Sequence, residues 1–313
     1  MTLPIWSNWQ PLSGALPFDA AVFAELIDGG QAFRWHRAGD VWTGVWADNV
    51  VRLRLGEGSR LEWSSPTALA PRMPEALRTY LALEPDAATL TDTLPWRSDP
   101  HLARCLAAFP GLRILRQPFG ETLLGFLCSA TKQIVQIKQM VGLLATRHGA
   151  EIAPGIFRLP TWDELATIPA ADLKACLLGF RARYIAETAR YIAAHPGWLE
   201  ETAALPYAEA KARLCELPGV GEKVADCVLL FGAGRLEAFP VDVWILRTMA
   251  LRYGLDGWKP AQVTQFGRAH FGDLAGLAQQ FLFAWERREQ RRGPPPLTSS
   301  IQKVPENSEA RKP

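Results

Sequence analysis

The chain has 313 residues, of which 48% are hydrophobic, so it can bury enough apolar surface for two domains. No run of about 18 apolar residues occurs, which excludes a transmembrane helix. The formal net charge is only +2, but it is unevenly distributed. Residues 1–100 carry 8 basic and 12 acidic side chains, and the remaining residues carry 26 basic and 20 acidic ones. This small basic excess after residue 100 gives weak support for a polyanionic partner.

The cysteines and the first residues indicate a reducing compartment. The five cysteines are scattered and odd in number, which is typical of buried thiols. They are Cys105, Cys128, Cys176, Cys215 and Cys227. No cysteine and histidine cluster has the spacing of a zinc site, and the N-terminus lacks the basic and apolar regions of a signal peptide. We therefore expect an intracellular protein that does not contact a membrane.

The first third of the chain has the pattern of strands and turns. Apolar and polar residues alternate over residues 33–36, 51–55 and 61–63. Glycine, aspartate and asparagine supply turn chemistry at residues 39–40, 48–49 and 56–59. These segments predict an antiparallel meander that is covered on one face.

From about residue 70 the apolar period changes to that of helices. Residues 121–148 predict two helices with a break at residues 129–131, and Thr161 opens a capping box with Glu164. Further helices are expected from Pro169 to Gly179, over 207–217, from 222 to the glycines at 232 and 234, and over 274–288. The fold class is α+β, with an N-terminal sheet domain at 1–112, an all-α domain at 113–290, and a disordered tail at 291–313.

A glycine hairpin followed by a lysine is the most informative segment. Residues 217–226 read Leu-Pro-Gly-Val-Gly-Glu-Lys-Val-Ala-Asp. Gly219 and Gly221 permit the positive φ values and the close approach that a tight hairpin against a phosphate backbone needs. A helix from about Glu222 would direct free N–H groups and its positive dipole end toward an anion. Lys223 lies in its first turn, where a cation is disfavoured, and this favours the neutral, nucleophilic amine.

An aspartate nineteen residues later gives this lysine a second interpretation. A lysine after an isolated hairpin is more often a phosphate contact than a nucleophile. Asp242, in Phe-Pro-Val-Asp at 239–242, could orient Lys223 and stabilise positive charge on a sugar. Asp242 could also be the N-cap of a helix from Val243, and capping would fix the position of its carboxylate.

Several motifs together carry a resemblance to a known family. Residues 217–243 resemble the helix-hairpin-helix and glycine/proline-aspartate motif of DNA glycosylases. Gly-Gln-Ala-Phe-Arg-Trp at 30–35, Leu-Gly-Phe-Arg-Ala-Arg-Tyr at 178–184 and Ala-Gln-Gln-Phe-Leu-Phe at 278–283 resemble further segments of eukaryotic-type 8-oxoguanine DNA glycosylases, in the family's order. The similarity spans roughly residues 20–290. It implies an N-terminal sheet like that of the TATA-binding protein, followed by the helix-hairpin-helix glycosylase domain.

The resemblance implies a catalytic pair and a base pocket. Lys223 would attack C1′ of the damaged nucleoside, displace the base and form a Schiff base that undergoes β-elimination, assisted by Asp242. The flipped base would lie between Cys227 and Phe283, with its Watson–Crick edge on Gln279 and its N7–H on the carbonyl of Gly30. Taken alone, Gly30 is an ordinary turn glycine, and Phe283 and Cys227 are ordinary core residues.

The resemblance also implies the DNA contacts and the partners. Phe180 would fill the vacated stack, Arg181 would contact the estranged cytosine, and the exposed Phe-Arg pair is hard to explain as core. The remaining DNA contacts would come from Gly219, Gly221 and Trp244, and backbone carbonyls of Cys215, Leu217 and Val220 would hold a monovalent cation. The implied substrate is duplex DNA with 8-oxoguanine, preferably opposite cytosine. The implied enzyme is a monomer without an iron–sulfur cluster or a required cofactor, in the cytoplasm (at the nucleoid) of a bacterium or in the nucleus or mitochondrion of a eukaryote.

Three departures from the family pattern concern the contacts with DNA. Thr131, Lys132, Gln133 and then Gln136 stand where the family usually has an asparagine run and an arginine, and Trp244 stands where a phosphate-contacting histidine is common. We therefore expect weaker opposite-base discrimination than is typical. The alternatives are an alkylated-base glycosylase, which typically lacks the lysine, and a non-catalytic hairpin module that only grips DNA.

Overall fold

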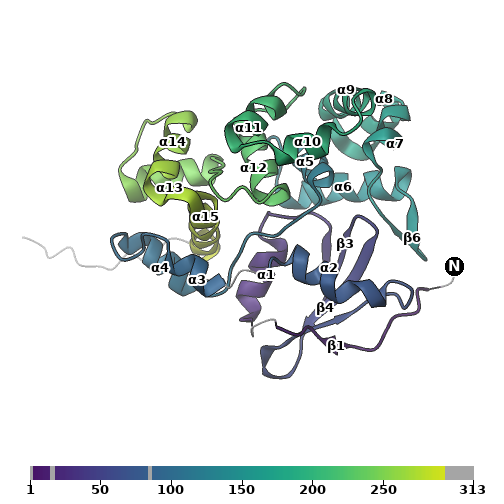
Figure 1. Cartoon of the computed structure of the whole chain (residues 1–313), viewed down its shortest axis with the longest axis horizontal. Helices are drawn as coiled ribbons and strands as arrows, with labels where there is room; N and C mark the ends of the chain where they lie inside the picture. The colour runs from purple at the N-terminus through teal and green to yellow at the C-terminus, as the bar shows by residue number, and fades with distance from the viewer. Residues whose placement is uncertain (1–2, 15–17, 84–86, 293–313) are drawn as a thin grey trace, which may run out of the picture.

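The computed structural model describes residues 3–14, 18–83 and 87–292. Its sheet lies in the lower half of Figure 1, with the central helices above it and the last helices at the left. The sheet has the strand order β1-β5-β4-β3-β2, all antiparallel. Its strands are β1 (Gln10–Pro11), β2 (Trp35–Ala38), β3 (Val41–Trp46), β4 (Asn49–Leu55) and β5 (Leu61–Ser64). The predicted meander is confirmed.

An aromatic cluster joins one face of this sheet to helix α2 (Met73–Tyr80). Trp35 stacks on Trp46 at a centroid distance of 6.1 Å and donates its indole N–H to Tyr80 Oη at 3.0 Å. Gly44 pairs with Trp35 across the strands, and a Cβ there would lie 2.4 Å from the indole ring. The glycine is therefore what lets the Trp35 ring lie flat on β3.

The helical region begins beyond this sheet. Its predicted break, its capping box at Thr161 and the helix that follows the hairpin are confirmed, and so is the α+β fold class. The helices are α1 (Ala20–Asp28), α3 (Ala87–Asp92), α4 (Pro100–Ala108), α5 (Phe119–Leu127), α6 (Ile134–His148), α7 (Trp162–Thr167), α8 (Ala170–Leu173), α9 (Arg181–Ala194), α10 (Trp198–Ala204), α11 (Tyr207–Cys215), α12 (Glu222–Gly232), α13 (Val243–Tyr253), α14 (Pro260–Phe271) and α15 (Ala275–Arg292). A π-helical segment, Lys174–Leu178, continues α8.

The helical region also holds a short β-hairpin that was not expected. Strands β6 (Glu151–Ala153) and β7 (Ile156–Phe157) pair antiparallel, and β6 reaches down toward the sheet in Figure 1. Ala153 packs with Val45 and Val50 on the sheet. The sheet is therefore covered on parts of both faces, not on one, because its second face carries apolar residues that need a partner.

The segment around α4 joins the C-terminal helices, although the sequence placed it in the N-terminal domain. Helix α4 packs against α15. Asp99 caps α4 through Oδ1, and its Oδ2 accepts hydrogen bonds from Tyr253 Oη at 2.9 Å and His270 Nε2 at 3.1 Å. The domain boundary at 112 stays a prediction. Of the predicted tail, residues 291–292 belong to α15, and residues 293–313 lie outside the described part of the chain.

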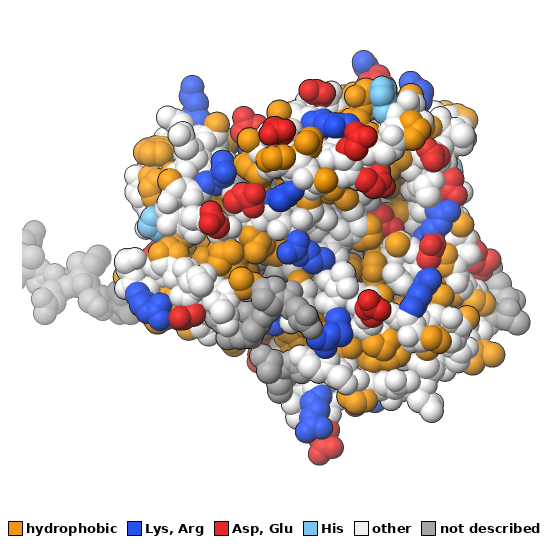
Figure 2. All heavy atoms as spheres, in the orientation of Figure 1, with side chains coloured by type: hydrophobic (Ala, Val, Ile, Leu, Met, Phe, Trp, Pro, Cys, Tyr) orange, Lys and Arg blue, Asp and Glu red, His pale blue; other side chains and the backbone are white. Residues whose placement is uncertain are grey.

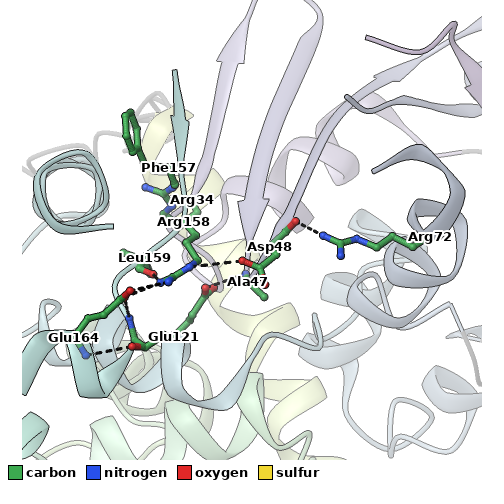
Figure 3. Close-up of polar contacts among 10 residues, drawn as sticks. Arg34, Ala47, Asp48, Arg72, Glu121, Phe157, Arg158, Leu159 and Glu164 are labelled. Carbon is green, nitrogen blue, oxygen red and sulfur yellow. Dashed lines mark hydrogen bonds and ion pairs between the residues drawn. The ribbon is translucent and has the colours of Figure 1, made fainter. Parts of the chain in front are cut away.

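The carboxyl group of a partly buried glutamate joins α5 to the sheet. Glu121 Oε1 accepts the backbone N–H of Ala47 at 2.9 Å, and Arg158 lies between Asp48 and Glu164 beside it (Figure 3). Burial raises the pKa of the Glu121 carboxyl to about 7, against the opposing effects of the Ala47 hydrogen bond and the Arg34 charge. The two parts of the chain therefore meet at a carboxyl that titrates near neutral pH.

This carboxyl predicts a pH-dependent stability. Its folded-state pKa is raised, so the folded protein holds the proton more tightly, and Glu121 costs stability as pH rises from about 4.5 to about 7. Glu121→Gln keeps an acceptor for Ala47 and removes the charge. We expect urea unfolding to show the variant gaining up to about 3 kcal/mol on wild type between pH 5 and pH 8. A difference that is the same at both pH values would contradict this assignment.

Candidate active site

The hairpin between α11 and α12 is built around one left-handed glycine. Gly219 has φ +79°, and a Cβ there would lie 2.6 Å from the ring of Tyr184 on α9. Tyr184 also meets Phe180 edge-to-face at 5.9 Å, so α9 supports the hairpin. The expected positive φ is wrong for Gly221, which has φ −98° and caps α12 in an extended conformation. A Cβ at Gly221 would meet nothing within 4 Å, so its backbone is open to a close approach.

Lys223 lies in the first turn of α12, and its side chain is half-buried. Its Nζ lies 5.2 Å from the ring centroid of Phe126 on α5. Cys227 follows one turn later on the same face and is buried. Burial raises the pKa of the Cys227 thiol to about 12, and the charge and hydrogen bond of Lys223 oppose that rise. Lys223 and Cys227 therefore lie on one face of α12, and their roles at a bound base stay a prediction.

Asp242 is the N-cap of α13 and also lies within electrostatic range of Lys223. Its Oδ1 accepts the backbone N–H groups of Trp244 at 3.0 Å and Ile245 at 2.9 Å. Burial raises the pKa of the Asp242 carboxyl, while the Ile245 hydrogen bond and the positive charge of Lys223 oppose that rise. The capping role is confirmed, and it fixes a carboxyl group beside the lysine.

The remote residues predicted to read a base lie together. Gly30 has φ +105°, and a Cβ there would lie 3.6 Å from Phe283 Cε1 and 3.1 Å from Ile134 Cδ1. Gln279, one turn before Phe283 on α15, is only 5% exposed, and its Oε1 has no hydrogen-bond partner within the described residues. A buried acceptor without a partner is costly and is typical of a site that a ligand completes.

A glutamine that the sequence reading missed holds this loop in place. Gln31 is fully buried, its Nε2 donates to Arg113 O and its Oε1 accepts Leu115 N–H, both at 2.9 Å. Its own carbonyl accepts from Gln117 Nε2 at 2.7 Å. No sequence signal could have found these bonds, because the partners are backbone groups more than eighty residues away.

The predicted exposed Phe-Arg pair is confirmed for Phe180 and wrong for Arg181. Phe180 is 58% exposed, whereas Arg181 is 2% exposed. The Arg181 guanidinium lies 4.3 Å from the Phe180 ring centroid and donates to Ala130 O and, at 3.2 Å, to Thr131 Oγ1. It is buried because its guanidinium donates to the loop between α5 and α6, and it thereby connects that loop to the start of α9 next to Phe180.

The remaining predicted DNA and cation contacts lie around the hairpin. Trp244 is partly exposed at the start of α13, and Leu217 O accepts Val220 N–H at 3.1 Å. Cys215 is exposed at the end of α11, so the expectation of buried thiols is wrong for this cysteine and confirmed for the other four. No group of three or more histidine, cysteine or acidic side chains suited to a metal occurs in the described ranges.

No helix within the described residues is long and apolar enough to cross a membrane. Basic and acidic side chains are interspersed on the face seen in Figure 2, so no single sign of charge covers that face. Any recognition of a polyanion on this face would therefore depend on specific groups.

Comparison with known proteins identifies the family. A family model described as "8-oxoguanine DNA glycosylase, N-terminal domain" matches residues 16–123. The N-glycosylase/DNA lyase OGG1 of Arabidopsis thaliana is 32% identical over 297 residues, which cover 90% of this chain and 81% of that protein. The chain belongs to the 8-oxoguanine DNA glycosylase family. A probable N-glycosylase/DNA lyase of Methanothermobacter thermautotrophicus is 31% identical over 64% of this chain and 71% of its own length.

Solved structures of 8-oxoguanine glycosylases have the same fold. The 8-oxoguanine glycosylase/lyase of Clostridium acetobutylicum, in complex with duplex DNA containing cytosine opposite 8-oxoguanine, superposes with a TM-score of 0.78 at 30% identity, over 86% of this chain and 92% of that one. A 3-methyladenine DNA glycosylase from Archaeoglobus fulgidus superposes with a TM-score of 0.71 at 19% identity, over 90% of this chain and 99% of that one, a likeness of fold alone.

Proposed function

We propose that this protein is a DNA glycosylase/AP lyase that excises 8-oxoguanine from duplex DNA through a Schiff base on Lys223. The observation that carries the proposal is the placement of Lys223 in the first turn of α12, one turn before the buried Cys227 and within electrostatic range of Asp242, the carboxyl group that caps α13. The family membership and the DNA-bound relative support the same substrate.

The chemistry follows from this pair. Neutral Lys223 attacks C1′, so that the Nζ–C1′ bond forms while the glycosidic bond breaks and the base leaves with a proton. Asp242 stabilises the positive charge that develops on the sugar and exchanges protons with the amine. The amine bound to C1′ then gives up a proton while the C1′–O4′ bond breaks and O4′ takes up a proton, which opens the sugar ring and leaves a Schiff base. The Schiff base loses a proton from C2′, and β-elimination breaks the bond between C3′ and the 3′ phosphate oxygen. These steps need no cofactor, because the lysine supplies the nucleophile.

Lesion recognition rests on the loop at Gly30 and on α15. The Gly30 carbonyl accepts a hydrogen bond from N7–H of 8-oxoguanine. Guanine has an acceptor at N7, so two acceptors would face each other there and no hydrogen bond would form. Gln279 bonds the Watson–Crick edge through its unpartnered Oε1, and the base stacks between Phe283 and Cys227. One hydrogen bond that forms or fails discriminates by about 1–3 kcal/mol.

The DNA backbone is held around the hairpin. Gly219, Gly221 and Trp244 approach phosphates, Phe180 fills the vacated stack, and carbonyls of Cys215, Leu217 and Val220 hold a monovalent cation there. Arg181 reaches the estranged cytosine only after leaving its bonds to residues 130 and 131. The protein acts as a monomer in the compartment that holds the DNA, which is the cytoplasm (at the nucleoid) in a bacterium or the nucleus or mitochondrion in a eukaryote.

Three duplexes test the proposal. One carries 8-oxoguanine opposite cytosine, one carries 3-methyladenine opposite thymine, and one is undamaged. We expect base release, and a covalent adduct under borohydride, only on the first. Release of the alkylated base in preference to 8-oxoguanine would contradict the proposed substrate.

Opposite-base preference is a separate prediction. Gln136 Oε1 accepts Gln133 N–H at 3.2 Å in the cap of α6, so this side chain is engaged where an arginine would reach cytosine. Because a good bidentate contact discriminates by about 1–3 kcal/mol, we expect excision opposite adenine or thymine to lie within about tenfold of that opposite cytosine. Gln136→Arg should sharpen the preference, and a wild type that already favours cytosine strongly would contradict the assignment.

A further inference from the structure

One stripe of α15 carries three residues that face the loop before β2. Gln279, Phe283 and Arg287 are spaced four residues apart, which places them on the same face of the helix. The first two are the proposed base contacts. Arg287 has a side chain that is only 12% exposed, and neither the sequence pattern nor the chemistry above gives it a role.

Arg287 connects the two walls of the proposed base slot. Its Nη1 donates to the carbonyl oxygen of Gly29 at 2.6 Å and to Glu25 Oε1 at 2.8 Å. Its guanidinium carbon lies 5.4 Å from the ring centroid of Phe283. A single side chain therefore contacts the stacking ring and the peptide that precedes Gly30.

The loop is held on the other side of Gly30 as well. The Gln31 carbonyl accepts from Gln117 Nε2, so the carbonyls before and after Gly30 are both occupied by side-chain donors. The φ of +105° at Gly30 sets the direction of the peptide between these two anchors. Charge-assisted bonds to a buried carbonyl and carboxylate are stronger than neutral ones, so Arg287 is the firmer anchor.

We propose that Arg287 is a positioning residue for lesion recognition, which fixes the Gly30 carbonyl relative to the Phe283 ring and so sets the selectivity for 8-oxoguanine over guanine. This inference rests on the proposed function. A hydrogen bond weakens steeply when its distance or angle changes. The two walls of the slot come from distant parts of the chain, since Arg287 and Gly29 are 258 residues apart in the sequence. Without this link, the loop and α15 are free to shift against each other.

Arg287→Met tests the role, because methionine keeps an apolar stem and removes the donors. The experiment compares single-turnover excision from an 8-oxoguanine duplex with strand cleavage at a preformed abasic site. An abasic site uses Lys223 and Asp242 but has no base to place in the slot. We expect the single-turnover rate of 8-oxoguanine excision to fall about 10- to 100-fold, while the rate of cleavage at the abasic site stays within about threefold of wild type.

Arg288→Met is the matched control. Arg288 lies next along α15, but it faces α4, where it packs 4.7 Å from the Phe109 ring centroid and donates to Ala108 O. This variant loses a similar side chain from the same helix, so we expect the ratio of the two activities to stay at the wild-type value. Arg287→Lys serves if the methionine variant does not fold, because lysine keeps the charge but is one bond shorter and has no planar face.

The outcomes separate the inference from the proposed function. A selective loss of 8-oxoguanine excision in the Arg287 variants supports the positioning role. Equal losses on both substrates, or no loss, overturn it and leave the proposed function intact. A wild type that cleaves abasic sites but releases no 8-oxoguanine contradicts the proposed function, and this inference fails with it.

Discussion

Lys223→Gln is expected to abolish the covalent adduct with DNA and to lower base excision by about a thousandfold or more. Glutamine has nearly the length of lysine without the amine, so it cannot form the Schiff base that the proposed reaction requires. The fold should not suffer. A cation in the first turn of α12 is electrostatically unfavourable, and the partly exposed side chain packs mainly against Phe126.

Borohydride trapping on an 8-oxoguanine duplex measures this effect directly. Lys259→Gln is a suitable control, because it removes an exposed lysine at the start of α14, away from the site. We expect this control to trap as wild type does. An adduct that persists in Lys223→Gln would mean that another amine is the nucleophile, and strand cleavage by wild type without any adduct would exclude a Schiff base altogether.

Asp242→Asn is expected to lower excision about 100- to 10,000-fold while changing stability little. Asparagine is as good an N-cap as aspartate, so the N–H groups of Trp244 and Ile245 keep an acceptor. The charge beside Lys223 is lost, and with it the stabilisation of the developing cation and a proton acceptor. Asp242→Ala removes the cap as well and should cost a further 0.5–2 kcal/mol or so of unfolding free energy.

The two variants together separate structure from chemistry. Single-turnover excision and urea unfolding are measured on both proteins. We expect similar losses of activity and clearly different stabilities. Nearly normal excision by Asp242→Asn would show that the carboxyl group serves only as a cap.

Local features of the fold could be predicted because their causes lie within a few residues. The capping box at Thr161 and the cap at Asp242 join side chains to N–H groups two or three residues away. The alternation in the later part of β4 and the continuous apolar run of α12 likewise reflect the local pattern of burial along each element. The hairpin β6–β7 was missed because strands of two and three residues carry no readable period.

The expectations that failed concern residues whose environment comes from elsewhere in the chain. Arg181 has the type and the local context of an exposed side chain, but the loop at Ala130 and Thr131, fifty residues earlier, buries it. Gly221 lies in a glycine hairpin, yet only Gly219 is left-handed there, and the ring of Tyr184 on α9 occupies the space that a Cβ at Gly219 would need. The hairpin pattern by itself did not distinguish the two glycines.

The α+β class, the hairpin with its lysine, the capping aspartate and the family resemblance could all be predicted from the sequence, because they depend on short spacings and on residue types. The packing of the chain was needed to place Gly30 against Phe283, to leave Gln279 Oε1 without a partner among the described residues, and to join Gly29 to α15 through Arg287. These contacts join residues some 250 positions apart, and their geometry depends on the packing of whole elements, which no local pattern encodes.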